Sequence, residues 1–446
     1  MEETLWPAPL AMAPVSGEVM IPGSKSITNR ALVIAAISAA PSVLRHIPQS
    51  RDSALMMGAL STLGVTIDQQ EHQQDMVVVT PLPADAVPAD VSVDCGLAGT
   101  VMRFVPPVAA LARGEITLDG DARARERPLR PLLSALTQLG VNITGPSDAS
   151  LPLQIAAHGS VPGGAATIDA SGSSQFVSAL LIAAARFHAG LQLTHAGPPV
   201  PSLPHIAMTC TMLAQHDVHV TSDVSDPTAA EWTVPSGPVS ALDRTIEPDL
   251  SNATPFLAAA MITGGTVRIQ GLAGSALQPV ARVQDVFTAM GATFASQDDA
   301  LLVSGTGRVQ GIAANLGDIG ELVPTVAALA ALADSPSDLT GIGHLAGHET
   351  DRLAALVREL SAMGSDITRT DDGLHINPRP LHAAPAWHTY HDHRMATAGA
   401  ILGLVTDKVM VENIATTAKT FPTFPSLWRS FVTGDVGNRE AHLHAP

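Results

Sequence analysis

The chain of 446 residues is long enough for two or three domains with sizeable buried cores. Hydrophobic residues make up 46% of it, which excludes wholesale disorder, and its formal charge of −17 argues against a nucleic-acid-binding surface. Two cysteines are too few for a disulfide framework, and no apolar run reaches the ~20 residues that span a bilayer, so we expect a cytoplasmic protein without membrane contact.

Six similar segments follow one another along the chain. In each of them a short polar stretch leads into a run rich in Ala, Leu and Val. These polar stretches begin 72 to 76 residues apart, at Ser26, Gly99, Ser173, Asp249, Glu321 and His393. A second series of amphipathic stretches runs in step and ends at Gly64, Gly140, Asp217, Gly291 and Gly364. Glycine at such a position is a typical helix stop.

Each segment is predicted to run strand, polar turn, buried helix, strand, amphipathic helix, strand. The first helix is apolar nearly all round and should be interior, whereas the second has one apolar stripe and should lie outside. Six such units are too many to share one hydrophobic core, so the pattern predicts two domains of three units, joined near residues 236–243. A solenoid is the alternative, but its common repeats of roughly 20–50 residues are shorter.

Positive charges gather where the buried helices are predicted to begin. Lys25 and Arg30 flank Ser26. Arg103 lies one turn beyond the second start, and Arg394 lies at the sixth. A helix N-terminus attracts anions through its unpaired N–H groups and its dipole, although Ser, Asp and Asn there are usually caps. If several starts converge, this acidic protein would hold a cationic pocket for a ligand with two anionic groups, such as a phosphate and a carboxylate.

Several other patterns have ordinary explanations. The segment 22–26 lacks both glycines of a Walker loop, which argues against a nucleotide triphosphatase. The arginine run in residues 123–130 is typical of a solvated loop. The sequence His-Asp-His at 391–393 is weak evidence for a metal, because no cysteine accompanies it. Glu321 could complement a helix dipole or, among cations, act as a general base.

Seven motifs in order resemble those of the EPSP synthase (3-phosphoshikimate 1-carboxyvinyltransferase) family over essentially the whole chain. They are residues 22–26 with Asn29 and Arg30, 98–100 with Met102 and Arg103, 126–128, 173–175, 349–352, 392–395 and 419–420. The resemblance implies an α/β fold of the inside-out barrel-like, enolpyruvyl transferase type, with six βαβαββ repeats. It also implies two three-repeat domains, 22–242 and 1–21 plus 243–446, with the active site in the cleft between them.

The resemblance implies transfer of the enolpyruvyl group of phosphoenolpyruvate to the 5-hydroxyl of shikimate 3-phosphate, with release of phosphate, on the pathway to chorismate and aromatic amino acids. Shikimate 3-phosphate would be held by Lys25, Ser26, Arg30, Ser173, Ser174, Gln175, Ser202, Glu321 and His348. Phosphoenolpyruvate would be held by Lys25, Gly99, Arg127, Gln175, Arg352, Arg394 and Lys419. No cofactor or metal is expected, because the substrate phosphate is the leaving group.

The same resemblance assigns the proton transfers. Glu321 would be the base for the hydroxyl, and Glu349 and Lys25 are candidates for the other transfers, with His393 nearby. The sequence departs from the family pattern in three places. Glu321 stands for the usual Asp, His348 stands for a frequent Lys and would make that contact pH-sensitive, and Leu97 replaces a common Asn.

Two alternatives stay open beside this prediction. The sister enzyme that acts on UDP-N-acetylglucosamine shares the fold but typically carries a reactive cysteine in the loop corresponding to residues 121–130, where this chain has none. A non-catalytic phosphometabolite-binding protein of the same fold should have lost the acid and base residues, which are present here. We expect a monomer whose partners are the two small-molecule substrates, with no nucleic acid and no membrane.

Overall fold

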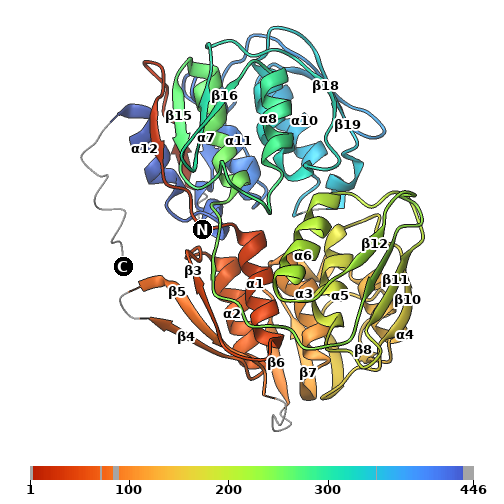
Figure 1. Ribbon diagram of the computed structural model, residues 1–446. Helices are drawn as coiled ribbons and strands as arrows, with labels where there is room; N and C mark the ends of the chain where they lie inside the picture. The colour runs from red at the N-terminus through yellow and green to blue at the C-terminus, as the bar shows by residue number, and fades with distance from the viewer. Residues whose placement is uncertain (1–3, 71–72, 84–89, 348, 435–446) are drawn as a thin grey trace. The chain divides into compact units, whose positions relative to one another are not determined.

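The computed structural model describes residues 4–70, 73–83, 90–347 and 349–434 (Figure 1). The chain divides into two compact units. The first, which we call the central unit, is Gly23–Ile246. The second, the terminal unit, combines Met1–Pro22 with Glu247–Pro446. Both units mix helices with small sheets, so the α/β class expected from the sequence is confirmed.

The central unit contains three four-stranded sheets with the same topology. In each, the first strand pairs parallel with the second, and the third and fourth follow antiparallel. The strand orders are β14 (Arg244–Thr245), β3 (Ser42–Arg45), β5 (Gln73–Thr80) and β4 (Thr66–Gln70); β6 (Val91–Asp94), β7 (Arg113–Asp119), β9 (Leu153–His158) and β8 (Asn142–Thr144); and β10 (Gly164–Ile168), β11 (Leu191–His195), β13 (Glu231–Val234) and β12 (Thr221–Asp223).

Three buried helices form the middle of the central unit. They are α1 (Lys25–Ile37), α3 (Gly99–Ala109) and α5 (Ser174–Ala184), and they pack on one another. Their residues are buried almost throughout, as the apolar runs predict. The helices with a single apolar stripe pack against them from outside and are α2 (Arg51–Thr62), α4 (Arg130–Gln138) and α6 (Leu203–Gln215). A short helix, η1 (Ala124–Glu126), precedes α4.

The terminal unit repeats this plan with strands drawn from both ends of the chain. Its two complete sheets run β2 (Gly17–Val19), β15 (Thr266–Ile269), β17 (Ala300–Ser304) and β16 (Thr293–Gln297); and β18 (Ala313–Asn315), β19 (Ser337–Thr340), β21 (Leu374–Asn377) and β20 (Asp366–Arg369). The third is shortened: β1 (Leu5–Pro7) pairs antiparallel with β22 (Met410–Glu412), and Trp387 forms a parallel bridge to Val411.

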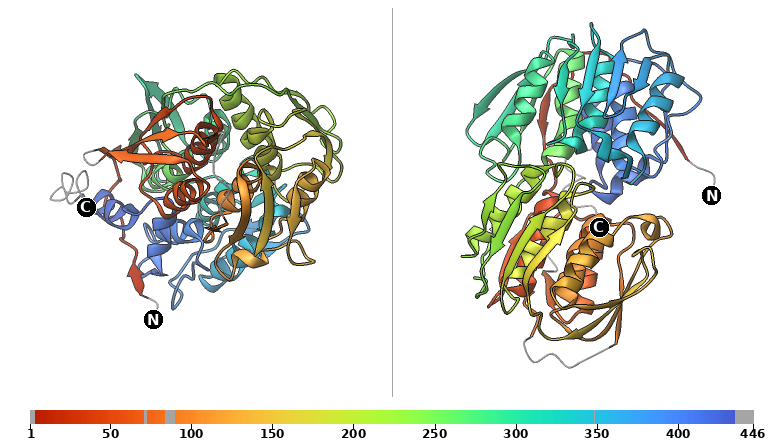
Figure 2. Two further views of the ribbon diagram at one scale, coloured as in Figure 1. Left: turned by 90° about the horizontal axis from the view of Figure 1, so that it is seen from below. Right: turned by 90° about the vertical axis from the view of Figure 1, so that its right-hand side faces the viewer.

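The helices of the terminal unit also fall into a buried and an outer set. The buried set packs together and comprises α7 (Leu250–Thr263), α9 (Val323–Ala331) and α11 (His393–Leu402). The outer set comprises α8 (Val280–Ala289), α10 (Arg352–Ala362) and α12 (Phe424–Thr433). Three short helices, η2 (Gly320–Leu322), η3 (Gly343–Gly347) and η4 (Ile414–Lys419), lie between them. Within each unit the sheets lie outside the buried helices (Figure 2).

The predicted helix stops are confirmed. Gly64, Gly140, Gly291 and Gly364 follow the outer helices with φ between 91° and 104°. L side chains rarely adopt that region. Asp217 occupies the equivalent position after α6 with φ 62°, which a short polar side chain tolerates better than most.

No helix in the described ranges is both long enough and apolar enough to cross a bilayer. This agrees with the longest apolar run in the sequence, which Pro41 interrupts.

Candidate active site

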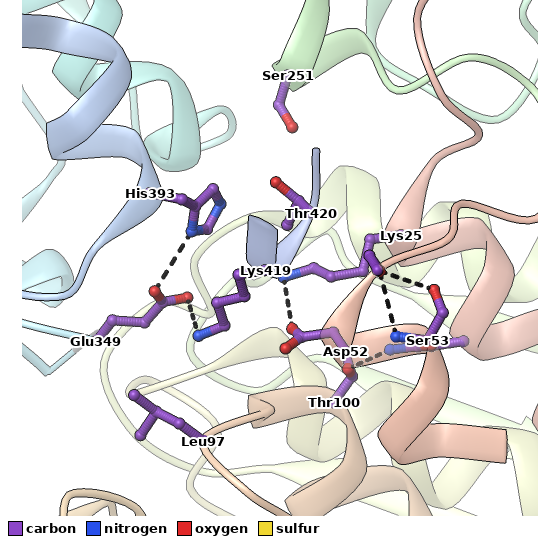
Figure 3. Close-up of polar contacts among 12 residues, drawn as sticks. Lys25, Asp52, Ser53, Leu97, Thr100, Ser251, Glu349, His393, Lys419 and Thr420 are labelled. Carbon is purple, nitrogen blue, oxygen red and sulfur yellow. Dashed lines mark hydrogen bonds and ion pairs between the residues drawn. The ribbon is translucent and has the colours of Figure 1, made fainter. Parts of the chain in front are cut away.

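The first candidate residues of the central unit lie at the start of α1. Lys25 opens the helix, and its Nζ donates to Oδ2 of Asp52 at 3.2 Å, in the first turn of α2 (Figure 3). The Asp52 carboxylate is 2% exposed and the Lys25 side chain 16%, so the pair holds the ammonium at the protein surface. Gly23 lies two residues before this helix. A Cβ there would lie 2.0 Å from the carbonyl oxygen of His46, so the close approach of these two backbone segments requires glycine.

Two arginines gather over the start of α3. A Cβ on Gly99 would lie 2.8 to 2.9 Å from guanidinium nitrogens of both Arg103 and Arg127, so a side chain there would push these two groups aside. Arg127 donates to the carbonyl of Leu97 at 3.3 Å. Burial lowers the pKa of Arg103 well below its usual value, and the neighbouring Arg127 lowers it further. Two close cations beside a helix N-terminus favour an anionic ligand.

Gln175 is tied to the same pair of cations. Nη1 of Arg103 donates to Oε1 of Gln175 at 2.9 Å. The backbone N–H of Gln175 donates to Oγ of Ser173, which caps α5, and Ser174 is the buried first residue of that helix. Arg103 therefore joins the start of α3 to the set Ser173, Ser174 and Gln175. The sequence alone could not reveal this connection.

Ser202 stands at the start of α6 in a strained conformation. Its φ is 52°, in the left-handed region that non-glycine residues seldom adopt, and its hydroxyl does not cap the helix. Such outliers cluster at functional sites.

Arg30 is placed differently from the other predicted contacts. Its side chain is 1% exposed and donates to Thr209 Oγ1 at 2.7 Å, to the Ser26 carbonyl at 3.0 Å, and to Ser178 Oγ and the His205 carbonyl. Burial lowers its pKa to about 9. Of its five N–H donors, four are thus engaged within the central unit.

The terminal unit brings together a buried arginine and two helix starts. Arg352, the first residue of α10, is 2% exposed. It donates two hydrogen bonds to the carboxylate of Asp392, from Nε at 2.7 Å and from Nη2 at 3.2 Å. Asp392 also caps α11 by accepting from the N–H of Arg394 at 2.9 Å. Burial alone would raise the pKa of Asp392, but Arg352 outweighs it and holds that pKa below the usual value.

Arg394 and Glu321 are further candidates on the terminal unit. Nη2 of Arg394 donates to Ser251 Oγ at 3.1 Å. Burial lowers the pKa of Arg394, and repulsion from Arg352 adds to this, whereas Glu321 opposes the shift. Glu321 raises the pKa of Arg352 in the same way, so it lies within electrostatic reach of both arginines. It sits in η2 at the entry to α9, half-buried.

Glu349 links the remaining candidates (Figure 3). Its Oε1 lies 2.9 Å from Nζ of Lys419, and its Oε2 lies 3.4 Å from Nδ1 of His393. Burial lowers the pKa of His393 and outweighs the opposing effect of Glu349, so the imidazole is neutral near neutral pH. Lys419 is held at the end of η4, where Thr420 donates to Asn252 and Phe421 packs on Phe256.

The geometry of this cluster disfavours a metal. Glu349, Asp392 and His393 each bring one ligand atom within 4.8 Å of the others. However, Lys419 already neutralises Glu349, and both oxygens of Asp392 accept hydrogen bonds from Arg352. A divalent cation would have to displace these fixed positive charges.

Most of the predicted residues fall into two groups, one on each unit, which we call the central set and the terminal set. The central unit carries Lys25, Ser26, Gly99, Arg127, Ser173, Ser174, Gln175 and Ser202. The terminal unit carries Glu321, Glu349, Arg352, His393, Arg394 and Lys419. His348 lies outside the described residues. Sequence reasoning missed Asp52 as the partner of Lys25, and it named Asp392 only within the motifs 391–393 and 392–395, not as the partner of Arg352. The only signal for these two pairs was an acidic residue at the start of a helix.

The fold is that of enolpyruvyl transferases. A solved EPSP synthase from Acinetobacter baumannii superposes with a TM-score of 0.78 over 95% of this chain and 97% of that chain, at 23% sequence identity. An enolpyruvyl transferase from Streptomyces tendae gives a TM-score of 0.72 over 96% and 97%, at 16% identity. Similarity at this level concerns the fold, and it confirms the predicted enolpyruvyl transferase architecture.

Sequence comparison identifies the family. The model for EPSP synthase (3-phosphoshikimate 1-carboxyvinyltransferase) matches residues 10–428. A 3-phosphoshikimate 1-carboxyvinyltransferase from Kocuria rhizophila is 51% identical over 438 residues, which are 97% of this chain and 97% of that protein. The chain therefore belongs to the EPSP synthase family, as its motifs predict.

Proposed function

We propose that this chain is a 3-phosphoshikimate 1-carboxyvinyltransferase that uses the residues of the central and terminal sets described above. It transfers the enolpyruvyl group of phosphoenolpyruvate to the 5-hydroxyl of shikimate 3-phosphate and releases phosphate. One observation in the structure supports this most strongly. Three basic side chains from the starts or ends of separate elements, Arg352, Arg394 and Lys419, surround two carboxylates that can move protons.

Phosphoenolpyruvate carries a phosphate and a carboxylate, and we assign its contacts to Lys25, Gly99, Arg127, Gln175, Arg352, Arg394 and Lys419. Arginine suits both groups because its planar fork can donate two parallel hydrogen bonds. At Gly99, the missing side chain lets the ligand approach the helix amides beside Arg127.

Shikimate 3-phosphate would take the hydroxyl-rich set of the central unit, with Lys25, Ser26, Ser173, Ser174, Gln175 and Ser202, together with Glu321 and His348. We assign Arg30 a structural role rather than the substrate-binding role that the resemblance implies. Because four of its donors are bonded internally and one of them holds the Ser26 carbonyl, Arg30 fixes the start of α1 and can offer only its remaining Nη1 hydrogen to a ligand.

The chemistry is addition followed by elimination through a tetrahedral intermediate. Glu321 removes the proton of the 5-hydroxyl as its oxygen attacks C2 of phosphoenolpyruvate, while the methylene carbon gains a proton. Lys25 and Glu349 are the two candidate donors of that proton. In the second step a proton leaves the methyl group, the C–O bond to phosphate breaks, and the double bond returns. The basic side chains of both sets stabilise charge on the departing phosphate.

A phosphate-release assay tests this function. The protein with phosphoenolpyruvate and shikimate 3-phosphate should release inorganic phosphate without added divalent metal. UDP-N-acetylglucosamine serves as the alternative acceptor. Phosphate release with that acceptor alone would transfer the assignment to the sister enzyme, and release with neither would indicate a non-catalytic relative.

We also propose that the protein acts as a monomer in the cytoplasm, because both substrates are small metabolites and all of the proposed site residues belong to one chain. Light scattering coupled to gel filtration should give a mass near 46.0 kDa. A mass of twice that value would contradict the monomer.

A further inference from the structure

A second buried carboxylate lies on the outer helix that carries Arg352. Glu359 of α10 has a side chain only 2% exposed. Its Oε2 accepts from the backbone N–H of His388 at 3.0 Å, and its Oε1 accepts from the hydroxyl of Tyr390 at 2.5 Å. Nδ1 of His388 lies 3.2 Å from Oε2. A buried carboxylate is costly unless it is bonded in this way, so its partners define what it does.

The partners of Glu359 belong to a strained turn. The N–H of Asp392 donates to the carbonyl of Thr389 at 2.8 Å and closes a four-residue turn. Both central residues, Tyr390 and His391, have positive φ, 54° and 56°. Such turns normally use Asn and Gly, and bulky residues there persist only where the surroundings hold them. A cavity of about 520 Å³ borders this turn, so it is not packed on every side.

The turn leads directly into the candidate site. Asp392, its last residue, caps α11, and His393 and Arg394 are the first residues of that helix. Arg352 and Glu359 are seven residues apart on α10 and therefore share one face. Arg352 holds the end of the turn at Asp392, and Glu359 holds its middle at Tyr390. One helix face thus sets where the first turn of α11 points.

We propose that Glu359, acting through Tyr390, is a positioning residue for Arg394. Burial, reinforced by the hydrogen bond to Glu359, raises the pKa of Tyr390 to about 12, although the neighbouring Arg358 opposes this rise, so the phenol keeps the proton that it donates. Losing this bond lets the turn relax toward ordinary backbone angles. The Arg394 guanidinium, at the start of α11, then leaves the orientation in which it binds phosphoenolpyruvate. This inference rests on the proposed role of Arg394.

The test compares Tyr390→Phe with the wild-type enzyme. The substitution keeps the ring and removes only the hydroxyl. We expect KM for phosphoenolpyruvate to rise on the order of ten-fold, because a hydrogen bond to a charged group is lost. The kcat and the KM for shikimate 3-phosphate should stay within about two-fold. Glu359→Gln, which retains one accepting oxygen, should have a smaller effect than Glu359→Ala.

A matched control separates positioning from stability. Val283→Ala empties part of the terminal-unit core on α8, far from α10 and α11 in the sequence, and should lower Tm without changing either KM. If Tyr390→Phe and Glu359→Gln behave like Val283→Ala, the proposal is wrong. Should the Glu359 variants fail to fold, Tyr390→Phe alone decides.

A double-mutant cycle distinguishes this inference from the role of Arg394 itself. Arg394→Lys alone should raise KM for phosphoenolpyruvate, and if it does not, the proposed role of Arg394 fails. If it does, Tyr390→Phe should add little in the Arg394→Lys background, because both changes remove the same interaction. Fully multiplicative effects would overturn the positioning proposal while leaving the proposed function intact.

Discussion

Individual side chains divide into those whose role the sequence indicates and those that only the fold reveals. Lys25, Glu321 and Arg394 stand at helix starts in recognisable motifs. Asp52 and Glu359 do not, because each matters through a partner 27 or more residues away. The spacing of charged residues along the sequence cannot predict such pairs, because it indicates only which side chains are neighbours on the same helix or strand.

The clearest residue-scale prediction concerns the proposed base. Glu321→Gln keeps the size of the side chain but cannot accept the hydroxyl proton, so turnover should fall by on the order of 10²–10⁴. Affinity for shikimate 3-phosphate should change by only a few-fold, measured by calorimetry beside the phosphate-release rate. Turnover at the wild-type rate would show that another group is the base.

Two helix caps differ in one respect that stability can measure. Asp392 and Asp351 both cap helices of the terminal unit and both pair with an arginine. The Asp351–Arg369 pair is exposed, whereas Asp392 pairs with Arg352, which is buried at 2% exposure. Asp392→Ala should cost about 3–5 kcal/mol because it removes the carboxylate that accepts two hydrogen bonds from this buried guanidinium. Asp351→Ala should cost roughly 1 kcal/mol, the usual value of a cap. Equal losses in urea unfolding would refute the importance of the buried pair.

Buried histidines predict how stability depends on pH. Burial lowers the pKa of His216, His344 and His393 in the folded protein. The unfolded chain therefore binds more protons, and the free energy of unfolding should decrease as pH falls below the unfolded value of about 6.5. His216→Asn, which can still donate to Ser240, should flatten the fall in Tm between pH 7.5 and 5.5. Parallel curves for variant and wild type would contradict this.

At the scale of elements, hydrophobic periodicity predicts the helices well. The buried and outer sets alternate as expected, because a helix that is apolar all round can be covered only in the interior. The short strands are harder to predict. Arg244 and Thr245 pair with β3 across about 200 residues, and a strand of two residues has no periodicity to detect.

The helix stops give a paired prediction. Gly291, at φ 104° after α8, should not tolerate a side chain, and Gly291→Ala should destabilise the protein by about 1–2 kcal/mol. Gly58 lies inside α2 with open space where a Cβ would stand. Gly58→Ala should therefore stabilise the protein by about 0.5–1 kcal/mol. Thermal melts of both variants check the opposite signs.

At the scale of the whole molecule, the division into units depends on which strands complete each sheet. The three sheets of the central unit are completed by residues 42–245, whereas the terminal unit borrows β1 and β2 from the start of the chain. The sixfold spacing revealed the repeats, and the resemblance implied that the first residues join the second domain. Nothing in the strand composition itself indicates the borrowing.

Fragments test this division. Residues 23–246 alone should give a cooperative thermal transition, because they contain every strand of their sheets. Residues 247–446 alone should fold poorly, and a peptide of residues 1–22 added in excess should restore helical signal by pairing with β15 and β22. Folding of 247–446 without the peptide would show that the borrowed strands are dispensable.

The borrowed strands also bear on synthesis of the protein in the cell. Residues 1–22 are translated before residues 23–446, yet the partner of β1 is made only when residues 410–412 are translated. At about 5–20 residues per second, the leading segment waits roughly 20–80 s, while the central unit can already fold behind it. Chaperones that bind nascent chains would therefore meet an extended N-terminal segment tethered to a finished domain.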